Sequence, residues 1–466
     1  MRKIAEERFV TRRRLLQAAA AVTGAVVSAA ATGRLAWAAP QLLTARPGRA
    51  SLLGASTQAT PVWAYNDLIP GPILRARRGD ELAVTLANRL EQPTTIHWHG
   101  LRLVNRMDGV PHLTQHAVGP GNSFEYRFTL PDAGTFWYHP HERSYEQVGR
   151  GLFGVLVVEE ETPPAADQDL VLVISDWRLG SDGALVDNFG ARHDQAHAGR
   201  LGNTITVNGH LEPAIPVRTN ERVRLRILNA SSARVLKLRL EGASTRLIAL
   251  DGQPVGPTAS YGGDLVLGPG NRADLMADMI GEPGTVLPLI EVSDKRRVLA
   301  TLDFHESERA RAEPMVAPIA LAANHLLREP DLASPLSTEI LMTGGAKDET
   351  DMATAMGTGP IWSFNGVSGM TENPLFSARR GQTVALRMIN GTAWPHAMHI
   401  HGHHFRLIAR KGGAKPEPFW WDTFLMQPRE EVTVAWVADN PGKWMIHCHM
   451  LDHQAAGMDT WFEVQA

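Results

Sequence analysis

Short runs of alternating hydrophobic and polar residues recur along the chain, and they lie between glycine, proline and asparagine turns. Three clear examples are residues 80–88, 221–229 and 381–390. Neighbouring side chains of a strand point to opposite faces of a sheet, so this period of two predicts antiparallel strands with one buried face. Long segments with the periodicity of an amphipathic helix are scarce. The pattern therefore predicts an all-β fold.

The alternating run belongs to a larger unit that occurs three times. The copies end at Asn88, Asn229 and Asn390, which are separated by the length of an ordinary domain. A repeat of this period indicates one folded unit per copy, here three β-sandwiches in succession. The predicted boundaries are 45–162 for domain 1, 165–305 for domain 2, 306–335 for a linker and 336–466 for domain 3.

Residues 1–38 have the features of an export signal. Arg12 and Arg13 form a twin-arginine pair before an alanine-rich run over 15–31, and the small residues around Trp37 offer a cleavage site. A transmembrane anchor is the alternative, but the run falls short of the roughly 20 strongly apolar residues that a span requires. We expect export by the twin-arginine route to the periplasm or the extracellular space, with no membrane span after the signal is removed.

The composition narrows the chemistry. Acidic residues (49) slightly outnumber basic ones (46), which argues against nucleic acid as the main partner. The chain has one cysteine, Cys448, so an intramolecular disulfide is excluded. Because the compartments outside the cytoplasm favour disulfides, an unpaired thiol there is either buried and inert or committed to other chemistry.

Histidine occurs in four H-x-H pairs, two in domain 1 and two in domain 3. Residues i and i+2 of a strand lie on one face about 6.6 Å apart, so each pair projects two imidazoles into the same space. If the two domains pack with these faces together, eight imidazoles converge, and buried basic groups of this kind require metal ions. Domain 2 has no histidine at the matching positions and is predicted to be a spacer. The pairs are His97/His99, His139/His141, His399/His401 and His447/His449.

Cys448 lies between the two histidines of the last pair and is therefore predicted to point to the opposite face of its strand. His453 and Met458 follow it, and His396 precedes the third pair. Two histidines, one cysteine and a weakly bound methionine are the ligand set of blue copper. The peptide chain would join such a copper directly to ligands of the histidine cluster, which is a short covalent route for electrons.

These motifs resemble those of multicopper oxidases, specifically the three-domain laccase-like group, from about residue 45 to the end of the chain. The resemblance implies cupredoxin-like Greek-key domains and four copper ions per chain. It also implies that a one-electron donor is oxidised at type 1 copper while O2 is reduced by four electrons to water at a trinuclear cluster. The motifs are H-x-H-G at 97–100, H-x-H at 139–141, H-x-x-H-x-H at 396–401 and H-C-H-x-x-x-H-x-x-x-x-M at 447–458.

The same resemblance implies which residues hold each copper. Type 1 copper is implied at His396, Cys448, His453 and Met458. Type 2 copper is implied at His97 and His399. The type 3 pair is implied at His99, His139 and His449 for one copper and at His141, His401 and His447 for the other.

Two positions bear on proton supply. Asp108 matches an acid that helps to deliver protons near the cluster in related enzymes, and the alternative is a turn residue before Gly109. Bacterial relatives often have glutamate directly after the type 1 histidine of the last motif, where this chain has Gln454. Glutamine cannot donate a proton as an acid, so the resemblance implies that Asp108 and water supply the protons.

The identity of the donor is predicted from the surroundings of the type 1 ligands. Bacterial cuprous oxidases carry a methionine-rich insert before domain 3, whereas residues 342–356 hold only Met342, Met352 and Met356, which we expect to be loop or packing residues. This favours a laccase-type oxidase of phenols and aromatic amines. A periplasmic metallo-oxidase of Cu(I), Fe(II) or Mn(II) in copper tolerance is the alternative. A non-catalytic scaffold is disfavoured because every ligand is present, and the oligomeric state is left open.

The remaining candidates match no motif position. His403 and His404 are expected at the surface or just behind the ligands. Asp422 is expected either to orient a loop near the type 1 site or to have no role there. A surface or hydrogen-bonded role is expected for His112, His116, His193, His197, His210, His305 and His325.

Overall fold

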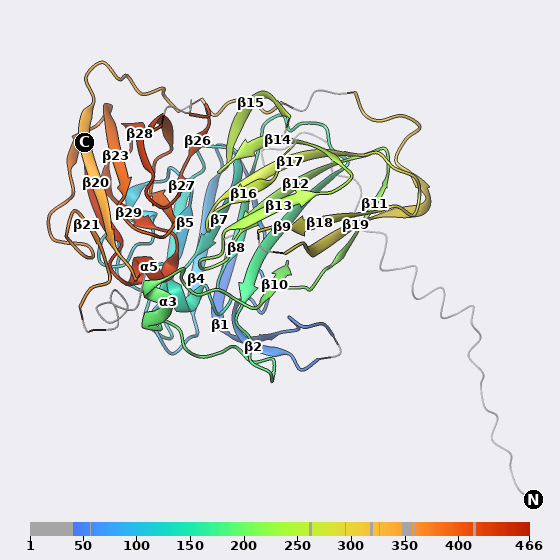
Figure 1. The fold of residues 1–466 in the computed structure, drawn as a ribbon, viewed down its shortest axis with the longest axis horizontal. Coiled ribbons are helices and arrows are strands. Elements are labelled where there is room, and N and C mark those ends of the chain that lie inside the picture. The colour runs from blue at the N-terminus through green and yellow to red at the C-terminus, as the bar shows by residue number, and fades with distance from the viewer. Residues whose placement is uncertain are drawn as a thin grey trace, which may run out of the picture. The chain divides into compact units, whose positions relative to one another are not determined.

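The computed structural model describes residues 41–466, apart from 56, 261–262, 294, 317–319, 326, 347–356, 358 and 413–415, and it describes only the backbone of 257–260. The predicted signal over 1–38 and two of the loop methionines, Met352 and Met356, lie outside the described residues. Strands dominate the described part and form six sheets, two for each repeat. The prediction of an all-β chain of three successive sandwiches is confirmed (Figure 1).

Domain 1 contains two four-stranded sheets around a core that includes Trp98, Tyr126 and Phe136. The first sheet has the order β2 (Thr60–Tyr65), β1 (Gln41–Ala50), β4 (Glu81–Asn88), β6 (Ser123–Thr129). The second has the order β3 (Leu74–Arg77), β8 (Gly154–Glu159), β7 (Gly134–His139), β5 (His97–His99).

Domain 2 contains a six-stranded and a five-stranded sheet. The first has the order β10 (Thr204–Val207), β9 (Gln168–Trp177), β12 (Glu221–Asn229), β17 (Arg272–Met279), β14 (Ser244–Leu250), β15 (Gln253–Ser260). The second has the order β11 (Ala214–Thr219), β19 (Arg297–Arg309), β18 (Val286–Glu291), β13 (Leu236–Leu240), β16 (Leu265–Leu267).

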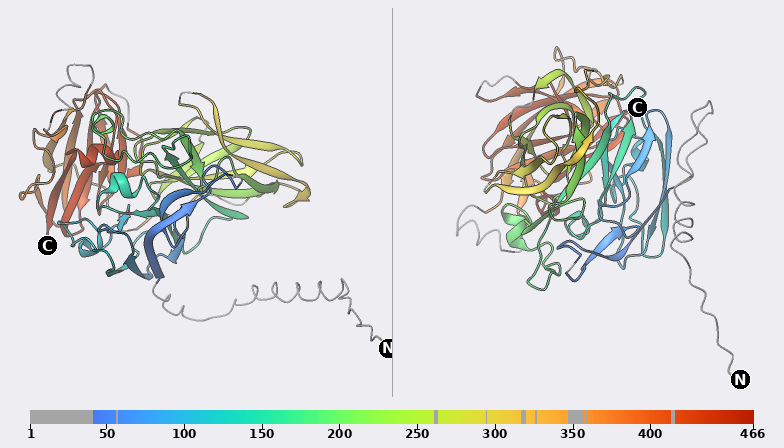
Figure 2. Two further views of the ribbon diagram at one scale, coloured as in Figure 1. Left: turned by 90° about the horizontal axis from the view of Figure 1, so that it is seen from below. Right: turned by 90° about the vertical axis from the view of Figure 1, so that its right-hand side faces the viewer.

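Domain 3 repeats the six-plus-five arrangement of domain 2, with strands that correspond one to one in the larger sheet. That sheet has the order β21 (Trp362–Phe364), β20 (Leu336–Gly344), β23 (Gln382–Asn390), β28 (Glu431–Ala438), β25 (Phe405–Arg410), β26 (Trp420–Trp421). The smaller one has the order β22 (Ser377–Arg379), β30 (Asp459–Gln465), β29 (Gly442–Cys448), β24 (His396–Ile400), β27 (Thr423–Met426). In the left view of Figure 2 its orange and red strands form a group separate from the yellow-green strands of domain 2.

The described helices are short: the 3-10 turn η1 (Asn105–Met107), α2 (Ser144–Gln147), α3 (Arg192–Ala196) and α5 (Leu451–Ala455). None of the helices in the described part of the chain has the length and apolar character needed to cross a membrane.

The asparagine that ends each repeat closes a turn. Nδ2 of Asn88 donates to the carbonyls of Gln92 and Val118, and Oδ1 accepts the backbone amide two residues further on. Asn229 and Asn390 make the same three hydrogen bonds in their own domains. A buried asparagine that satisfies three backbone groups fixes the connection after its strand, which explains why the sequence repeat ends there.

A buried ionic group connects domains 1 and 2. Oδ2 of Asp274 accepts from Arg224 at 2.6 Å and from Arg226 at 3.2 Å. Its other oxygen accepts the hydroxyl of Thr135, on β7 of domain 1, at 2.7 Å. These side chains are almost fully buried, so each charge depends on its partners for solvation.

Removal of this carboxylate is expected to destabilise the protein. The change Asp274→Ala leaves two buried guanidinium groups without their shared anion, and we expect the free energy of unfolding to fall by about 3–5 kcal/mol. The measurement is chemical denaturation followed by tryptophan fluorescence. The matched control, Glu125→Ala, removes an exposed partner of Arg127 and is expected to cost less than about 1 kcal/mol. Equal losses in the two variants would contradict the assignment.

Candidate metal centres

In domain 1 the register of β5 and β7 gathers the histidines. The two strands are antiparallel, with His97 directly opposite His139. Alternation along β5 turns the indole of Trp98 into the core of domain 1, and it leaves His97 and His99 on the other face. His141 follows β7, and its ring centroid lies 5.3 Å from that of His97.

In domain 3 the antiparallel register of β24 and β29 gathers the histidines in the same way. His399 is opposite His447, and Met398 is opposite Cys448. Cys448 and Met398 lie in the core of domain 3, while the histidines lie on the other face. The strand alternation therefore places Cys448 as the sequence predicts.

The two sets of histidines meet where domains 1 and 3 are in contact. The ring of His99 stacks on His399 with centroids 3.7 Å apart, and His97 stacks on His401 at 3.9 Å. All eight side chains of the four pairs are buried. Within this cluster, three sets have ligand atoms that all lie within 4.8 Å of one another: His97, His399 and His401; His97, His99 and His139; and His141, His401 and His447.

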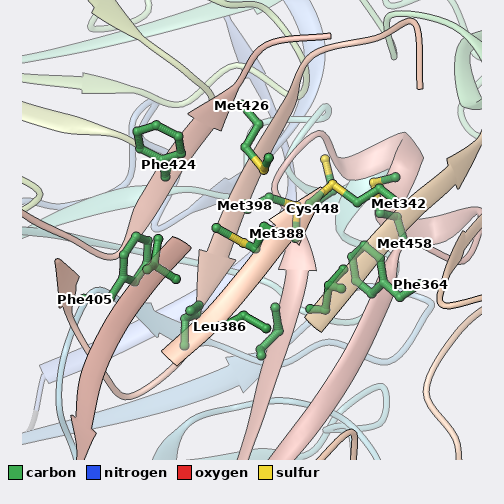
Figure 3. Close-up of a cluster of buried hydrophobic side chains, with 14 of the residues drawn as sticks. Met342, Phe364, Leu386, Met388, Met398, Phe405, Phe424, Met426, Cys448 and Met458 are labelled. Carbon is green, nitrogen blue, oxygen red and sulfur yellow. The ribbon is translucent and has the colours of Figure 1, made fainter. Parts of the chain in front are cut away.

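A second group forms on the core side of β29. Nδ1 of His396 lies 3.6 Å from Sγ of Cys448, and Nδ1 of His453 lies 3.8 Å from it. The two Nδ1 atoms are 3.1 Å apart. Met458 belongs to the same buried cluster as Cys448 (Figure 3), and its backbone pairs with the backbones of Cys448 and His453.

The partners of these rings determine where their protons are. Nδ1–H of His401 donates to the carboxylate of Asp108 at 2.8 Å, and Nδ1–H of His447 donates to the carbonyl of Cys448 at 2.9 Å. Both Nε2 atoms are then unprotonated, and they face each other at 3.1 Å. Two lone pairs at this separation repel, and a cation between them removes the repulsion.

The same holds for the second group. Nε2–H of His453 donates to the carbonyl of His197 at 2.6 Å, and Nε2–H of His396 donates to the hydroxyl of Thr392 at 2.8 Å. The Thr392 hydroxyl has its own acceptor in Asn390, so it accepts from the ring. Both Nδ1 lone pairs therefore point at each other and toward Cys448.

The unpartnered ring atoms fit metal ions as well. Several imidazole nitrogens are buried without any hydrogen-bond partner: His97 Nε2, His99 Nδ1, His141 Nε2 and His399 Nε2. Burial lowers the pKa of His99, His141 and His399, and the neighbouring imidazoles lower it further. Neutral rings with inward lone pairs are the metal-binding form of histidine. The residues present therefore fit a cluster of bound copper ions.

Burial shifts the pKa of Cys448 in the opposite direction from the pKa of the histidines, and it too favours the neutral form. Burial raises the pKa of its thiol to about 12, because the apolar surroundings disfavour the thiolate. Figure 3 shows Cys448 among methionine and aromatic side chains. A thiolate there requires a directly bound cation, and a metal that binds Cys448 displaces the thiol proton.

Asp108 contacts one proposed ligand from domain 1 and one from domain 3. Its Oδ2 accepts from His401 of domain 3, and its backbone carbonyl accepts Nδ1–H of His97 at 2.8 Å. Its Oδ1 is buried without a hydrogen-bond partner, 3.2 Å from Nδ1 of His97. The aspartate thus orients two imidazoles through their Nδ1 atoms, and its second oxygen lies beside Nδ1 of His97.

The structure decides between the two alternatives for Asp422. It is next to His99 and not near the type 1 group: its Oδ1 accepts Nε2–H of His99 at 3.1 Å, and its carbonyl accepts Nδ1–H of His399 at 2.7 Å. Arg272 of domain 2 donates to both carboxylate oxygens, at 2.9 and 2.6 Å. Of the two alternatives, the structure supports no role at the type 1 group, because Asp422 directly precedes β27 at the end of that strand that pairs with His399 and not with His396.

Sequence reasoning missed this network and the part that domain 2 has in it. Asp251 of domain 2 accepts from the amide of Arg272 and from the amide of Thr423 in domain 3. Burial, followed by the nearby Asp422, raises the pKa of Asp251 to about 7. Domain 2 therefore contacts both metal groups, and its description as a spacer was wrong. No local spacing signals this, since the partners lie far apart in the sequence.

The other histidines are buried, half-buried or exposed. His403 and His404 are buried, and Nδ1–H of His403 donates to the carbonyl of His401 at 3.2 Å. His197 is half-buried and supplies the carbonyl that accepts from His453. The exposed ones are His112, His116, His193, His210, His305 and His325.

Known proteins share these features. Models of the multicopper oxidase family match residues 47–163, 168–285 and 334–466. The multicopper oxidase MmcO of Mycobacterium tuberculosis is 32% identical over 451 residues, which cover 90% of this chain and 85% of that protein. The structure of a multi-copper oxidase from Pseudomonas thermotolerans matches with a TM-score of 0.81 at 35% identity, over 91% of this chain and 98% of that one. A metallo-oxidase from Campylobacter jejuni matches with a TM-score of 0.77 at 29% identity, over 91% of each chain.

Three β-sandwiches that bring a histidine cluster next to a cysteine–histidine group define an oxidoreductase that uses O2. The chain belongs to the multicopper oxidase family. Its sandwiches are cupredoxin-like, as the sequence resemblance implies. The family and the clustered ligands together imply a copper cofactor.

Acid is expected to destabilise the metal-free protein. The buried histidines have lowered pKa values in the fold, so below about pH 6.5 the unfolded chain binds more protons than the folded one. The midpoint of thermal unfolding should therefore fall as the pH falls from about 7.5 to about 5.5. Copper, which the gathered imidazoles of the folded protein bind more tightly than the unfolded chain does, should raise the midpoint at both pH values.

The control is His447→Ala, which removes one of the facing lone pairs. Its metal-free form should lose less stability on acidification than the wild type, and copper should raise its midpoint by a smaller amount. A copper-dependent rise equal to that of the wild type would contradict the assigned metal group.

Proposed function

We propose that this protein is a laccase-type multicopper oxidase with four copper ions per chain. Phenols or aromatic amines lose one electron at a time at a type 1 copper, and O2 is reduced to two water molecules at a trinuclear cluster. When bound, the coppers supply the one-electron redox steps. The proposed type 1 ligands are His396, Cys448, His453 and Met458. The proposed cluster ligands are His97, His99, His139, His141, His399, His401, His447 and His449.

One observation carries this proposal, namely the arrangement of three consecutive residues at the end of β29: His447 and Cys448 are its last two residues, and His449 follows it. Cys448 points to its group with His396 and His453, while His447 and His449 point to the cluster on the other face. Nε2 of His449 lies 3.4 Å from that of His139, and Nε2 of His447 lies 3.1 Å from that of His401. A single strand therefore bridges the site of donor oxidation and the site of O2 reduction.

Proton supply is assigned to Asp108. Its Oδ1 lies 3.2 Å from Nδ1 of His97 without a hydrogen-bond partner, and this carboxylate can hold a proton and pass it on by way of water. Gln454 occupies the position of the second acid in related bacterial enzymes, and its Oε1 accepts the hydroxyl of Ser144 at 2.8 Å. Gln454 therefore links α5 to α2 by a hydrogen bond, and its amide cannot act as a proton donor in catalysis.

The preference for organic donors rests on the burial of the methionines around Cys448 (Figure 3), which belong to the core of domain 3 and are not exposed to a donor. Met342 is fully buried in the core of domain 3, so it serves packing there. Thr392 and Trp394 precede His396: the hydroxyl of Thr392 is hydrogen-bonded to the His396 ring, and the indole of Trp394 donates to the carbonyl of Ala346 at 2.9 Å. We further propose that residues 1–38 direct export through the twin-arginine route, so that the enzyme acts in the periplasm or outside the cell.

Loss of the thiolate is expected to remove the oxidase activity. The change Cys448→Ser should abolish the blue absorption of type 1 copper and lower donor oxidation to background, because a hydroxyl is a poor ligand for copper. Absorption spectra and O2 consumption with 2,6-dimethoxyphenol measure both effects. Met388→Leu, in the same apolar cluster, is the control and should keep both. Undiminished turnover in Cys448→Ser would refute the proposal.

Loss of the acid is expected to slow turnover without loss of copper. In Asp108→Asn the amide oxygen can still accept from His401, but the group no longer exchanges a proton, so kcat should fall by about 10²-fold. The readouts are O2 consumption across pH and copper content. Asp80→Asn, on the surface of domain 1, should behave like the wild type. A fully loaded Asp108→Asn enzyme with normal kcat would show that water alone supplies the protons.

A further inference from the structure

A cavity of about 330 Å³ lies where the linker runs over domains 1 and 3. Its wall includes Arg102 of domain 1, His325 and Arg328 of the linker, and Arg380 and Asp439 of domain 3. Three separate parts of the chain therefore contribute to it. The described residues that line it include none of the proposed copper ligands.

The charge of this wall is mainly positive. Among the described residues, three guanidinium groups line the cavity, those of Arg102, Arg328 and Arg380, against the one carboxylate of Asp439. A concave surface with an excess of one charge concentrates the electric field and attracts ions of the opposite sign. The lining therefore favours an anion.

Arg102 is the buried charge of the wall, and it is already paired. Its side chain is 7% exposed, and Nε and Nη2 donate to the two carboxylate oxygens of Asp132 at 2.7 and 2.8 Å. Its Nη1 lies 3.6 Å from a carboxylate oxygen of Asp439. Burial raises the pKa of Asp439, and the charge of Arg102 counteracts that shift. Arg102 thus serves the two acids beside it, and the charge available to a ligand belongs to Arg328 and Arg380.

These two arginines have no partner of their own. Within the part of the chain that the structure describes, neither guanidinium has a hydrogen bond or a salt bridge, and both residues are exposed. Two like charges that line one cavity repel each other, and an anion between them removes the repulsion. Arg328 and Arg380 are therefore the donors of the site.

The linker is anchored on both sides of Arg328. The side-chain amide of Asn324 exchanges two hydrogen bonds with the backbone of Ala133 in domain 1, at 3.0 and 2.9 Å. Further along, Glu329 forms an ion pair with Arg406 of domain 3. An anchored segment therefore presents Arg328 to the cavity, so that less conformational freedom is lost when a ligand binds.

We propose that this cavity binds a tetrahedral oxyanion, either phosphate or the phosphate group of a small monoester, through Arg328 and Arg380. A guanidinium donates two parallel N–H bonds to the oxygens of a phosphate group. Four oxygens at tetrahedral angles can accept from two guanidinium groups of different segments, whereas one guanidinium fork fills both oxygens of a flat carboxylate. The bound anion joins the linker to domain 3 and stabilises their contact.

Binding is tested on the copper-loaded enzyme by calorimetric titration at constant ionic strength in chloride. The probes are inorganic phosphate and, in a separate titration, glycerol 1-phosphate. We expect one site per chain in the wild type, and a Kd higher by about tenfold or more in Arg328→Gln and in Arg380→Gln. The matched control is Arg379→Gln, which changes an exposed arginine next in sequence that does not line the cavity. It should bind as the wild type does, and far-UV circular dichroism checks that all four proteins are folded.

Thermal unfolding gives a second readout. Phosphate should raise the midpoint of the wild type and of Arg379→Gln, and it should raise the midpoint of the other two variants less. Equal affinity in all four proteins would overturn the site, because phosphate would then bind elsewhere, for instance at copper. A response to acetate as strong as the response to phosphate would overturn the ligand class, and no saturation by either probe would overturn the inference as a whole. Tighter binding of glycerol 1-phosphate would identify a monoester as the occupant, and tighter binding of inorganic phosphate would identify the free ion.

Discussion

Unprotonated imidazole nitrogens that face each other at 3.1 Å are the constraint on which the metal groups depend. Their protons are held on the outer nitrogens by acceptors such as Asp108 and the carbonyl of His197. This arrangement disfavours the metal-free protein and favours a bound cation. The facing nitrogens have no hydrogen-bond donor beside them, so a cation is the partner that can accept their lone pairs. The acceptors behind the ligands are therefore as much part of the metal groups as the ligands themselves.

Much of the fold follows from the sequence because the signals are local. Strand alternation predicts that Cys448 and its neighbouring histidines point to opposite faces, and the structure shows this on β29. The repeated asparagines mark the domains because each closes the same turn. The sequence predicts that the histidine pairs converge only if domains 1 and 3 pack with their histidine faces together. Strand spacing does not show which faces two distant domains present to each other.

The contacts between domains could not be predicted in this way. Arg272 and Asp422 form a bidentate pair that orients His99, yet the two residues belong to different domains and neither carries a local motif. A buried arginine in a strand resembles an exposed one in sequence, since only the tertiary structure supplies its partner. The role of Asp422 could not be decided from the sequence for the same reason, because the end of β27 that it adjoins is set by the pairing of that strand with β24.

Domain 2 completes the enzyme although it supplies no proposed copper ligand. Through Arg272 and Asp251 it holds the carboxylate behind His99, and through His197 it covers the outer edge of His453. If it only separated its neighbours, these buried contacts could be replaced by apolar ones at little cost. Their position suggests a stricter requirement: domains 1 and 3 have to meet at a fixed distance for eight rings to share metals. Because domain 2 contacts residues beside the ligands of both domain 1 and domain 3, it fixes the distance between them more tightly than a flexible linker can.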